Sequence, residues 1–378
     1  MKILQLSSAQ QFGGGERHVT DLCIGLTNLG HEVHLVVRPK SLLPPLVKNA
    51  NVTCHEMPLR GAIDLASAYK LARLAKKLAV DLIHTHYARD YPLTALAIRF
   101  CNYQNFYPKF FLTRHHYLPV HANWAYKRLL NVLDRAITVS NTVCDTLARS
   151  FDWEINNPKL AVIPNWINLA KFSLTETKQE SRVKFDIPPN KTVIGIVNQL
   201  TMAKGQHLLL EAIHLLKDKI DPDYLIVFAG SEHDSQKPYT KLLEGLINKF
   251  QLNDKVKLLG HISSLASLYN ALDIAVIPSE NEAFSIVCLE AMVSRCPVIA
   301  SNIGGLAELV KEGDTGLLFQ VGDSKALSEK LFLLLSNLEL QEKLSQKAYL
   351  FATENFAMEK VIAQIEDLYK KAVSRSFH

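Results

Sequence analysis

The chain has 378 residues, 48% of them hydrophobic and 21% charged, so it is long enough for two globular domains with separate cores. No apolar run reaches the roughly eighteen residues that a membrane-spanning helix requires, and Met1–Leu6 is too short and too quickly polar for a signal peptide. Six cysteines are scattered without CxxC pairs, so neither a disulfide framework nor a zinc site is indicated. These features predict a cytoplasmic protein.

The net charge of +5 is distributed unevenly along the chain. Residues 1–150 contain 18 lysines and arginines against 9 acidic residues, whereas residues 151–378 contain 24 against 28. The first part is therefore expected to favour anionic partners. Residues 99–135 are rich in aromatic and basic side chains, which fits an anionic membrane surface and ordinary helix packing equally well.

Short apolar runs alternate with amphipathic stretches in the first half, a pattern that predicts a parallel sheet with helices on both faces. The predicted strands are 3–6, 31–37, 52–57, 81–84, 110–113, 136–139 and 160–163. One predicted helix follows Gly13–Gly15 and ends at Gly30, and another covers residues 62–78.

The composition turns polar and proline-bearing between Asn168 and Asn190, which indicates a domain boundary. A second alternating series follows, with predicted strands 192–197, 224–229, 255–258, 273–277 and 297–300, and then helices at 325–335, 339–350 and 356–374. The sequence therefore predicts an α/β protein of two doubly wound, Rossmann-like domains that face each other across a cleft.

A glycine-rich turn, Gly13–Gly15, lies between a predicted strand and a predicted helix, so its backbone amides can approach a phosphate or a sugar closely. It is not a dinucleotide fingerprint, because His18 occupies the last position of the GxGxxG spacing and no acidic residue follows near Val37. A flexible turn without a ligand is the alternative interpretation.

Histidines and an arginine follow two further strands of the first half. His84 and His86 end one predicted strand, and Arg114, His115 and His116 end another. Ligands bind at the carboxyl edge of open α/β sheets, so these side chains are expected to line the same cleft. A metal pair of His84 and His86 would need a third ligand that the sequence does not indicate. Hydrogen bonding to loops or to an acceptor is the preferred interpretation, and a polar loop without a ligand is the alternative.

The segment Gln199–Gln206 connects the first strand of the second domain to a helix. Lys204, just before the helix N-terminus, is well placed to act as a point charge on a leaving diphosphate. Ordinary helix capping and solvation is the alternative for an isolated lysine and glycine at this position.

Residues 278–285 connect a buried strand to a helix, which places backbone N–H groups and the positive end of the helix dipole where an anion can bind. Glu282 lies in this loop, and Glu290 follows about two helical turns later. Carboxylates accept hydrogen bonds from hydroxyls, so the pair indicates a ligand with a phosphate and vicinal diols. The alternative is a first-turn acid at 282 and a solvated helix residue at 290. The apolar neighbours of Glu290 and a second glycine-rich helix start at Gly304-Gly305 favour the ligand site.

These residues resemble the retaining glycosyltransferases of glycosyltransferase family 4, which have the two-domain GT-B fold. The resemblance covers nearly the whole chain, and its specific part is PSENEAF…LEAM…PVIAS…GG…E at 278–308. GGGER at 13–17, the Lys204 loop and VIPNWIN at 162–168 support it. It implies an acceptor-binding domain at 1–180, a nucleotide-sugar-binding domain at 181–355, and a C-terminal helix at 356–378 that packs back on the first domain.

The resemblance also implies roles for individual residues. Lys204 would hold the donor diphosphate, Glu282 the hydroxyls of the transferred sugar, and Glu290 the ribose. His115 would lie near the reacting sugar, as a third catalytic residue beside Lys204 and Glu282. The other donor-binding residues would be Gly14, Gly15, Gln199, Ala283, Phe284 and Ser285, and the acceptor side would comprise Glu16, Arg17, His84, His86, Arg114 and His116. No metal and no other cofactor is implied.

Two positions depart from the family pattern. Gln199 stands where the family usually has arginine, and Ala283 stands where it usually has glycine. Losing a cation that acts only as the leaving group departs can raise the barrier by about 3 kcal/mol. Low or absent activity is therefore one expectation for this chain.

The resulting hypothesis is transfer of a sugar from a nucleotide diphosphate sugar, with UDP favoured over GDP and ADP, to a lipid-linked or envelope saccharide. The anomeric configuration would be retained. The protein would be cytoplasmic, with peripheral association at an anionic membrane surface, and nucleic acid is not an expected partner. The alternatives are a nucleotide-sugar epimerase or hydrolase of the same fold, a non-catalytic nucleotide-sugar-binding partner and, third, a nicotinamide dehydrogenase.

Overall fold

The computed structural model describes residues 1–10, 13–120, 122–232, 234 and 236–374. It divides into two compact units, the first made of Met1–Asn165 with the segment from Met358 onward and the second of Trp166–Ala357. The last four residues of the predicted C-terminal helix lie outside the described part of the chain.

A seven-stranded parallel sheet in the order β3-β2-β1-β4-β5-β6-β7 forms the centre of the first unit. All seven predicted strands are confirmed, as β1 (Lys2–Ser7), β2 (Glu32–Val37), β3 (Val52–Glu56), β4 (Leu82–Thr85), β5 (Lys109–Arg114), β6 (Arg135–Thr138) and β7 (Leu160–Val162). In β1, Leu4 pairs in register with His34 on one side and Ile83 on the other. The strand order reverses between β1 and β4, and ligands of doubly wound folds bind at such a switch point.

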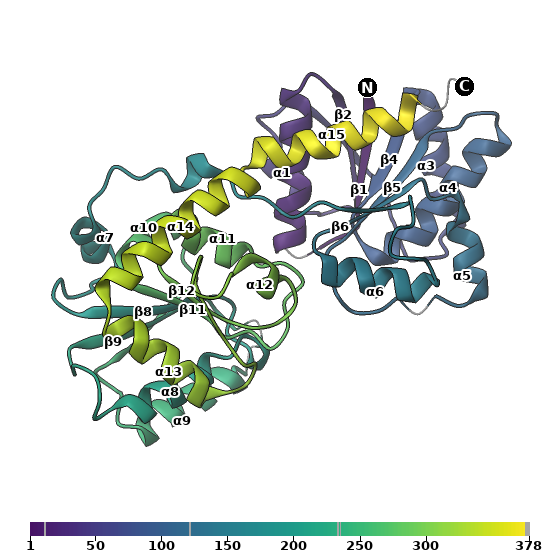
Figure 1. Cartoon of the computed structure of the whole chain (residues 1–378). Coiled ribbons are helices and arrows are strands. Elements are labelled where there is room, and N and C mark those ends of the chain that lie inside the picture. The colour runs from purple at the N-terminus through teal and green to yellow at the C-terminus, as the bar shows by residue number, and fades with distance from the viewer. Residues whose placement is uncertain (11–12, 121, 233, 235, 375–378) are drawn as a thin grey trace. The chain divides into compact units, whose positions relative to one another are not determined.

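Helices cover both faces of this sheet (Figure 1). They are α1 (Gly14–Asn28), α2 (Leu43–Leu46), α3 (Leu65–Leu78), α4 (Tyr91–Tyr103), α5 (Trp124–Leu129), α6 (Asn141–Phe151) and α15 (Met358–Ser374). The helix predicted from residue 62 begins three residues later, because the Asp64 carboxylate accepts a hydrogen bond from the Ser67 amide at 3.0 Å and caps the helix there. Its apolar face packs in the first core with Leu71, Ala72 and Ala75 fully buried.

The second unit repeats the arrangement with a six-stranded parallel sheet in the order β10-β9-β8-β11-β12-β13. The five predicted strands are confirmed as β8 (Thr192–Val197), β9 (Tyr224–Ala229), β10 (Val256–Gly260), β11 (Ile274–Ile277) and β12 (Val298–Ser301). The sixth, β13 (Leu317–Phe319), has three residues and was not among the predicted strands. The helices are α7 (Lys178–Lys184), α8 (Gln206–Leu216), α9 (Pro238–Lys249), α10 (Leu265–Ala271), α11 (Ile286–Val293), α12 (Gly304–Leu309), α13 (Ser324–Leu335) and α14 (Leu338–Phe356).

The chain passes between the units at Asn165–Trp166 rather than at the predicted 180/181. The polar stretch that suggested the later boundary belongs to the second unit, where the Arg182 guanidinium forms an ion pair with Asp273 at 2.7 Å. The chain returns to the first unit after Ala357. This second crossing lies next to the first one, because the Ile167 amide donates a hydrogen bond to the Phe356 carbonyl at 2.8 Å. Both crossings are thus held by backbone pairing at the edge of the second unit.

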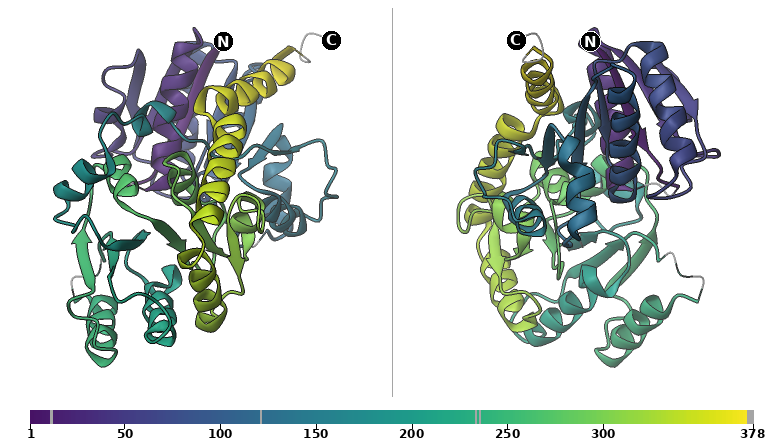
Figure 2. Two further views of the ribbon diagram at one scale, coloured as in Figure 1. Left: turned by 60° about the vertical axis from the view of Figure 1, so that its left-hand side comes forward. Right: turned by 90° about the vertical axis from the view of Figure 1, so that its right-hand side faces the viewer.

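Helix α15 belongs to the first unit, where it packs against α1 (Figure 1; further views in Figure 2). Its buried face carries Val361, Ile362, Ile365 and Tyr369. Gly25 on α1 allows the close approach, since a Cβ atom there would lie 2.3 Å from the Ile362 side chain. The hydroxyl of Tyr369 reaches the sheet itself, 2.5 Å from Nδ1 of His84.

Some aromatic residues of the segment 99–135 pack in the interior, and others are exposed as a membrane-facing surface would require. Phe110 and Phe111 are fully buried, whereas Trp124 and Tyr107 are 74% and 65% exposed. The guanidinium of Arg128 lies 5.4 Å from the centre of the Trp124 ring. Among the described residues, no helix is both long and apolar enough to cross a membrane.

Candidate active site

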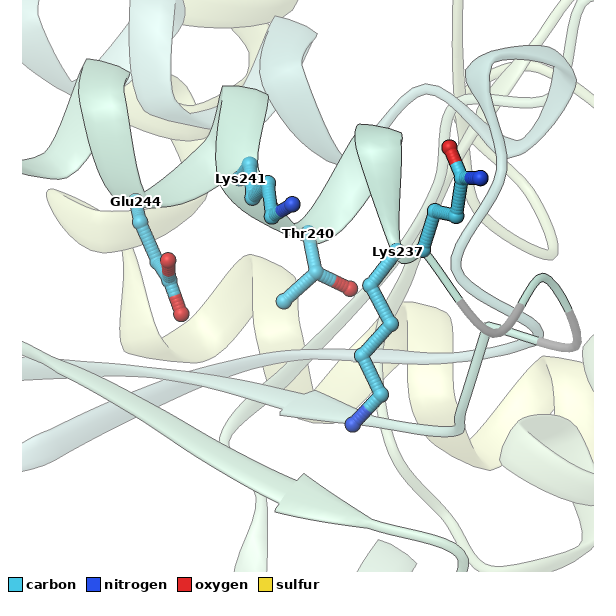
Figure 3. Close-up of a pocket in the computed structure, with 5 residues that line it drawn as sticks. Lys237, Thr240, Lys241 and Glu244 are labelled. Carbon is cyan, nitrogen blue, oxygen red and sulfur yellow. The ribbon is translucent and has the colours of Figure 1, made fainter.

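The second unit has a surface hollow of about 370 Å³ at the start of α9 (Figure 3). It is lined by Gln236, Lys237, Thr240, Lys241 and Glu244, and none of the predicted site residues is among them. The predicted site lies instead in the loops that follow β8, β11 and β12.

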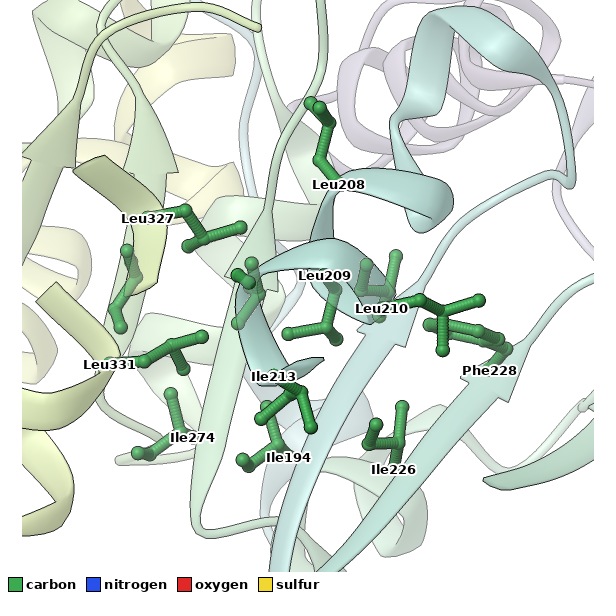
Figure 4. Close-up of a cluster of buried hydrophobic side chains, with 14 of the residues drawn as sticks. Ile194, Leu208, Leu209, Leu210, Ile213, Ile226, Phe228, Ile274, Leu327 and Leu331 are labelled. Carbon is green, nitrogen blue, oxygen red and sulfur yellow. The ribbon is translucent and has the colours of Figure 1, made fainter. Parts of the chain in front are cut away.

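A continuous apolar core holds the strands that carry these loops. Ile194 on β8 and Ile274 on β11 are fully buried together with Leu209 and Ile213 of α8 (Figure 4). At about 25 cal/mol per Å² of buried apolar surface, such a cluster fixes the strands firmly. The strand ends, and the loops that begin there, are therefore rigidly placed.

The loops after β8 and β11 bring Lys204 and Glu282 together. The Lys204 ammonium lies 2.7 Å from Oε2 of Glu282, and the two side chains are 22% and 15% exposed. Glu282 precedes α11 and forms an ion pair with a lysine of another loop. It is therefore not the isolated first-turn acid of the alternative interpretation. The structure thus joins two of the three predicted catalytic residues.

Gly205 sets the distance between these two loops. Its φ of +70° lies in the left-handed region, and a Cβ atom would meet the Pro278 carbonyl oxygen at 2.2 Å. The Glu280 amide donates to the Ala203 carbonyl at 2.9 Å across the same contact. A side chain at position 205 would push the lysine loop away from the glutamate loop.

Gly304 plays the same part for the loop after β12. With φ at +47°, a Cβ atom there would lie 2.2 Å from the Glu282 carbonyl oxygen. That oxygen accepts a hydrogen bond from the Gly305 amide at 2.9 Å. Three strand–loop–helix connections are therefore joined around Glu282 by their backbones.

Helix α11 begins immediately after this loop. Oγ of Ser285 accepts a hydrogen bond from the Cys288 amide at 3.3 Å and so caps the helix. Phe284 is 8% exposed and packs against Phe356, with ring centres 5.9 Å apart, while Ala283 is half-buried. The positive end of the α11 dipole therefore lies beside the ion pair, where it favours negative charge.

Glu290 is 3% exposed on α11, so it is not the solvated helix residue of the alternative interpretation. The Tyr269 hydroxyl lies 3.3 Å from Oε2 of Glu290 and 3.2 Å from the Val287 carbonyl oxygen, so its single proton is shared between these two acceptors. Burial, together with the negative charge of Glu290, raises the pKa of Tyr269, which keeps the hydroxyl protonated as a donor. Sequence reasoning missed Tyr269. Its only signal is a tyrosine within an apolar helix, whose buried hydroxyl requires a partner.

Gln199, the substitution for the usual arginine, lies at the start of the lysine loop with an exposed side chain. Its backbone is fixed at both ends: the amide donates to the Asn198 side chain at 2.9 Å, and the carbonyl accepts from the Gln206 side chain at 3.0 Å. The side-chain amide group of Gln199 is neutral, so this position adds no cation to the lysine loop.

In the first unit, the glycine-rich turn leads into α1, with Gly13 as its N-cap and Gly14 and Gly15 in its first turn. Glu16 is 8% exposed, and burial raises the pKa of its carboxyl group. The Arg17 guanidinium lies 3.9 Å from the Asp21 carboxylate one turn later. These residues lie at the carboxyl end of β1, as predicted.

The predicted histidines differ in accessibility. His84 is fully buried, and its ring nitrogens lie 2.5 Å from the Tyr369 hydroxyl and 2.8 Å from Oγ1 of Thr113. Neither nitrogen of His84 is left for an acceptor, so its placement on the acceptor side is corrected: it belongs to the interior. His86 and His115 instead gather with His18, a residue that the prediction did not include.

The remaining acceptor-side residues, Arg114 and His116, lie at the end of β5 and just after it. Arg114 is 6% exposed, and its guanidinium donates to the Leu118 carbonyl, so it braces the loop after the strand. His116, the next but one along the chain, is exposed. Partial burial of its ring and the neighbouring arginine lower the pKa of His116.

Comparisons with known proteins agree with this architecture. The profile described as Glycosyltransferase Family 4 matches residues 12–171, and the profile described as Glycosyl transferases group 1 matches residues 177–351. N-acetyl-alpha-D-glucosaminyl L-malate synthase of Bacillus anthracis is 25% identical over 94% of this chain and 93% of its own length. Three further curated relatives are matched over 47–58% of their own lengths.

Solved structures show the same fold. A glycosyltransferase from Rickettsia africae has a TM-score of 0.87 and 25% identity, with 98% of each chain covered. Anabaena Alr3699/HepE in complex with UDP and glucose has a TM-score of 0.83 and 21% identity, over 98% of this chain and 100% of that one. With two parallel-sheet α/β units and both family profiles matched in order, the chain belongs to glycosyltransferase family 4, glycosyl transferases group 1, of the GT-B fold.

Proposed function

We propose that this protein transfers a sugar from a UDP-sugar to a hydroxylated acceptor with retention of the anomeric configuration. The observation that carries the proposal is the Lys204–Glu282 ion pair beside the start of α11. A cation, a helix N-terminus and a carboxylate in one place match the diphosphate and the hydroxyls of a nucleotide sugar. The UDP and glucose bound by Anabaena HepE support the choice of base.

The site residues would act chiefly through electrostatics. As the bond from the sugar to the diphosphate breaks, negative charge grows on the leaving oxygen and positive charge on the sugar ring. Lys204 and the α11 dipole would stabilise the departing diphosphate, and Glu282 would exchange its bond with Lys204 for bonds to sugar hydroxyls. Glu290, oriented by Tyr269, would bind the ribose hydroxyls.

Retention is proposed from the family resemblance. The departing phosphate oxygen would take the acceptor proton on the same face of the sugar, so that no protein nucleophile is required. The structural contribution of this chain would be to position the two substrates and to exclude water, because hydrolysis of the donor competes with transfer.

For the acceptor, we propose a lipid-linked or envelope saccharide reached at an anionic membrane surface. A hollow of about 600 Å³ in the first unit is lined by Arg99, Trp124, Lys127, Arg128, Asn131 and Val132, which is basic and aromatic as interfacial segments are. The relative CapM of Staphylococcus aureus, a capsular polysaccharide biosynthesis glycosyltransferase, supports a saccharide. The name of the Bacillus anthracis relative includes L-malate, so hydroxy acids belong in the acceptor panel.

Product analysis tests the proposal. The full chain is incubated with UDP-, GDP- and ADP-sugars, alone and with saccharide and hydroxy-acid acceptors, and products are followed by NMR of the anomeric proton. Acceptor-dependent release of UDP with a retained anomeric configuration is expected. Conversion of donor alone would instead indicate an epimerase or hydrolase. A rise in melting temperature with donor and no turnover would indicate a non-catalytic binding protein, the alternative that Gln199 motivates.

Membrane association has its own test. Binding of the full chain to vesicles that contain phosphatidylserine should be strong at low salt and weaken as salt screens the basic surface. Absence of binding at low salt would remove the membrane from the proposal and leave the transfer reaction untouched.

A further inference from the structure

We propose that His18, His86 and His115 form a binding site for a borderline divalent transition-metal ion such as Zn²⁺ in the first unit. One ligand nitrogen from each ring lies within 4.8 Å of the other two. The rings come from three separate places: the first turns of α1, the residue after β4 and the residue after β5. All three lie at the carboxyl edge of the first sheet. Metal binding at this site does not require the proposed transfer reaction, although the family resemblance places His115 near the reacting sugar.

The rings face one another closely. The ring centres of His18 and His115 are 4.5 Å apart in an edge-on arrangement, and those of His18 and His86 are 5.5 Å apart. The rings of His86 and His115 are stacked at 6.1 Å. The metal pair considered from the sequence was His84 and His86, whereas the cluster joins His86 to His115 and His18 and does not include His84.

Hydrogen bonds fix which nitrogen of His86 carries the proton. Nε2 of His86 lies 2.7 Å from Oε1 of Gln5, and because an amide oxygen only accepts, Nε2 donates. Gln5 is itself oriented, since its Nε2 lies 3.4 Å from the Tyr369 hydroxyl. Nδ1 of His86 is therefore unprotonated, buried and without a hydrogen-bond partner in the described part of the chain.

The same reasoning applies to His18. Its Nδ1 lies 2.9 Å from Oδ1 of Asn165 and donates to it, so Nε2 keeps its lone pair. For His115, Nε2 is buried and has no hydrogen-bond partner among the described residues. Metal-bound histidines characteristically donate their other ring N–H to a carbonyl or carboxylate oxygen, as His18 and His86 do here.

A bound cation would stabilise the buried nitrogen lone pairs of this cluster. The buried Nδ1 of His86 and Nε2 of His115 lack hydrogen-bond partners among the described residues, which is unfavourable, and a cation between the rings would supply the missing interaction. Neutral imidazole is the form that binds metals.

The ligand set indicates the class of ion. Imidazole nitrogens suit Zn²⁺, Cu²⁺, Ni²⁺ and Fe²⁺, whereas Mg²⁺ and Ca²⁺ require oxygen ligands. Three histidines leave a fourth tetrahedral position for water or another ligand. Zn–N bonds of about 2.0–2.1 Å place tetrahedral ligand nitrogens about 3.4 Å apart, so the rings would rotate slightly inward on binding.

Metal titration of the chelator-treated full chain tests the proposal. Zn²⁺ should bind with one equivalent per chain in competition with a chromophoric chelator, and Co²⁺ should give the intense visible absorption of a tetrahedral complex. His86→Asn and His115→Asn should each weaken Zn²⁺ binding more than a hundredfold. Asn165→Ala, which removes the acceptor for His18, should weaken it by about 10–100-fold.

The controls separate metal binding from folding. His261→Asn removes an exposed histidine of the second unit and should leave affinity and stoichiometry unchanged. His115 is half-buried, so its variant is the least prone to unfold, and circular dichroism of the metal-free form verifies the fold. Absence of stoichiometric Zn²⁺ binding, binding unchanged in both ligand variants, or the weak spectrum of six-coordinate Co²⁺ would each overturn the proposal.

Discussion

Replacing Lys204 by methionine separates the catalytic from the structural contribution of the ion pair. Methionine keeps an unbranched side chain and removes the charge. At 2.7 Å, two unit charges attract by roughly 6 kcal/mol at an effective dielectric constant of about 20. Desolvation and side-chain ordering offset most of this attraction, because pairs with such partial exposure contribute about 1 kcal/mol to the free energy of unfolding.

The expected effect on catalysis is larger. Removing one preorganised group that stabilises developing charge typically lowers kcat by about 10²–10³, equivalent to about 3–4 kcal/mol of barrier. Lys204→Met should therefore lower kcat/KM at least a hundredfold while the free energy of unfolding falls by only about 1 kcal/mol. Part of the loss should appear in kcat, because the charge on the diphosphate grows as the bond breaks.

Steady-state kinetics and urea unfolding of the same preparations measure the two effects. Lys178→Met is the matched control, since Lys178 forms an ion pair with Asp273 in the same unit, outside the candidate site. It should change stability by a similar amount and leave kcat/KM unaltered. Activity of Lys204→Met within threefold of the native protein would refute the assignment of Lys204 to the leaving group.

Three further predictions concern packing, orientation and pH. Gly205→Ala should destabilise the protein by at least about 2 kcal/mol more than Gly313→Ala in urea unfolding, because both glycines have φ near +70° but only a Cβ at 205 meets a backbone atom at 2.2 Å. Tyr269→Phe should weaken UDP-sugar binding about tenfold in calorimetry, since Glu290 loses one hydrogen-bond donor, and unchanged affinity would contradict that role. Burial raises the pKa of Asp90 to about 6 in the folded protein. As pH rises from about 4 to 6, this carboxyl group therefore loses its proton in the unfolded chain before it does so in the folded one. Over that interval the free energy of unfolding should fall by about 2 kcal/mol relative to Asp90→Asn, and parallel pH profiles would contradict it.

The strands of both sheets could be predicted because buried parallel strands are continuous apolar runs bounded by turns. β13 was not predicted, although its three residues form a short apolar run as those of β7 do. The boundary between the units was misplaced because a polar surface stretch, 173–180, has the composition of a linker although α7 folds onto the second unit.

The candidate site could be predicted only where its residues lie close together in one short stretch of sequence. Glu282 and the start of α11 follow from a strand–loop–helix pattern, whereas the contact of Lys204 with Glu282 joins residues far apart in the chain and depends on the fold. His84 and His86 look alike in sequence, yet one lies in the interior and the other in a cluster with His18. Two-residue spacing fixes the side of the strand but not the neighbours that a side chain meets.

The central claim is that the site around Lys204 and Glu282 binds the diphosphate and the sugar of a nucleotide sugar. Isothermal titration of the full chain with UDP-sugars, carried out in parallel on the native protein and Lys204→Met, tests it most directly. We expect saturable binding of one molecule per chain that weakens at least tenfold in the variant. Equal affinity in the two proteins, or no binding of any nucleotide sugar up to millimolar concentration, would contradict the account.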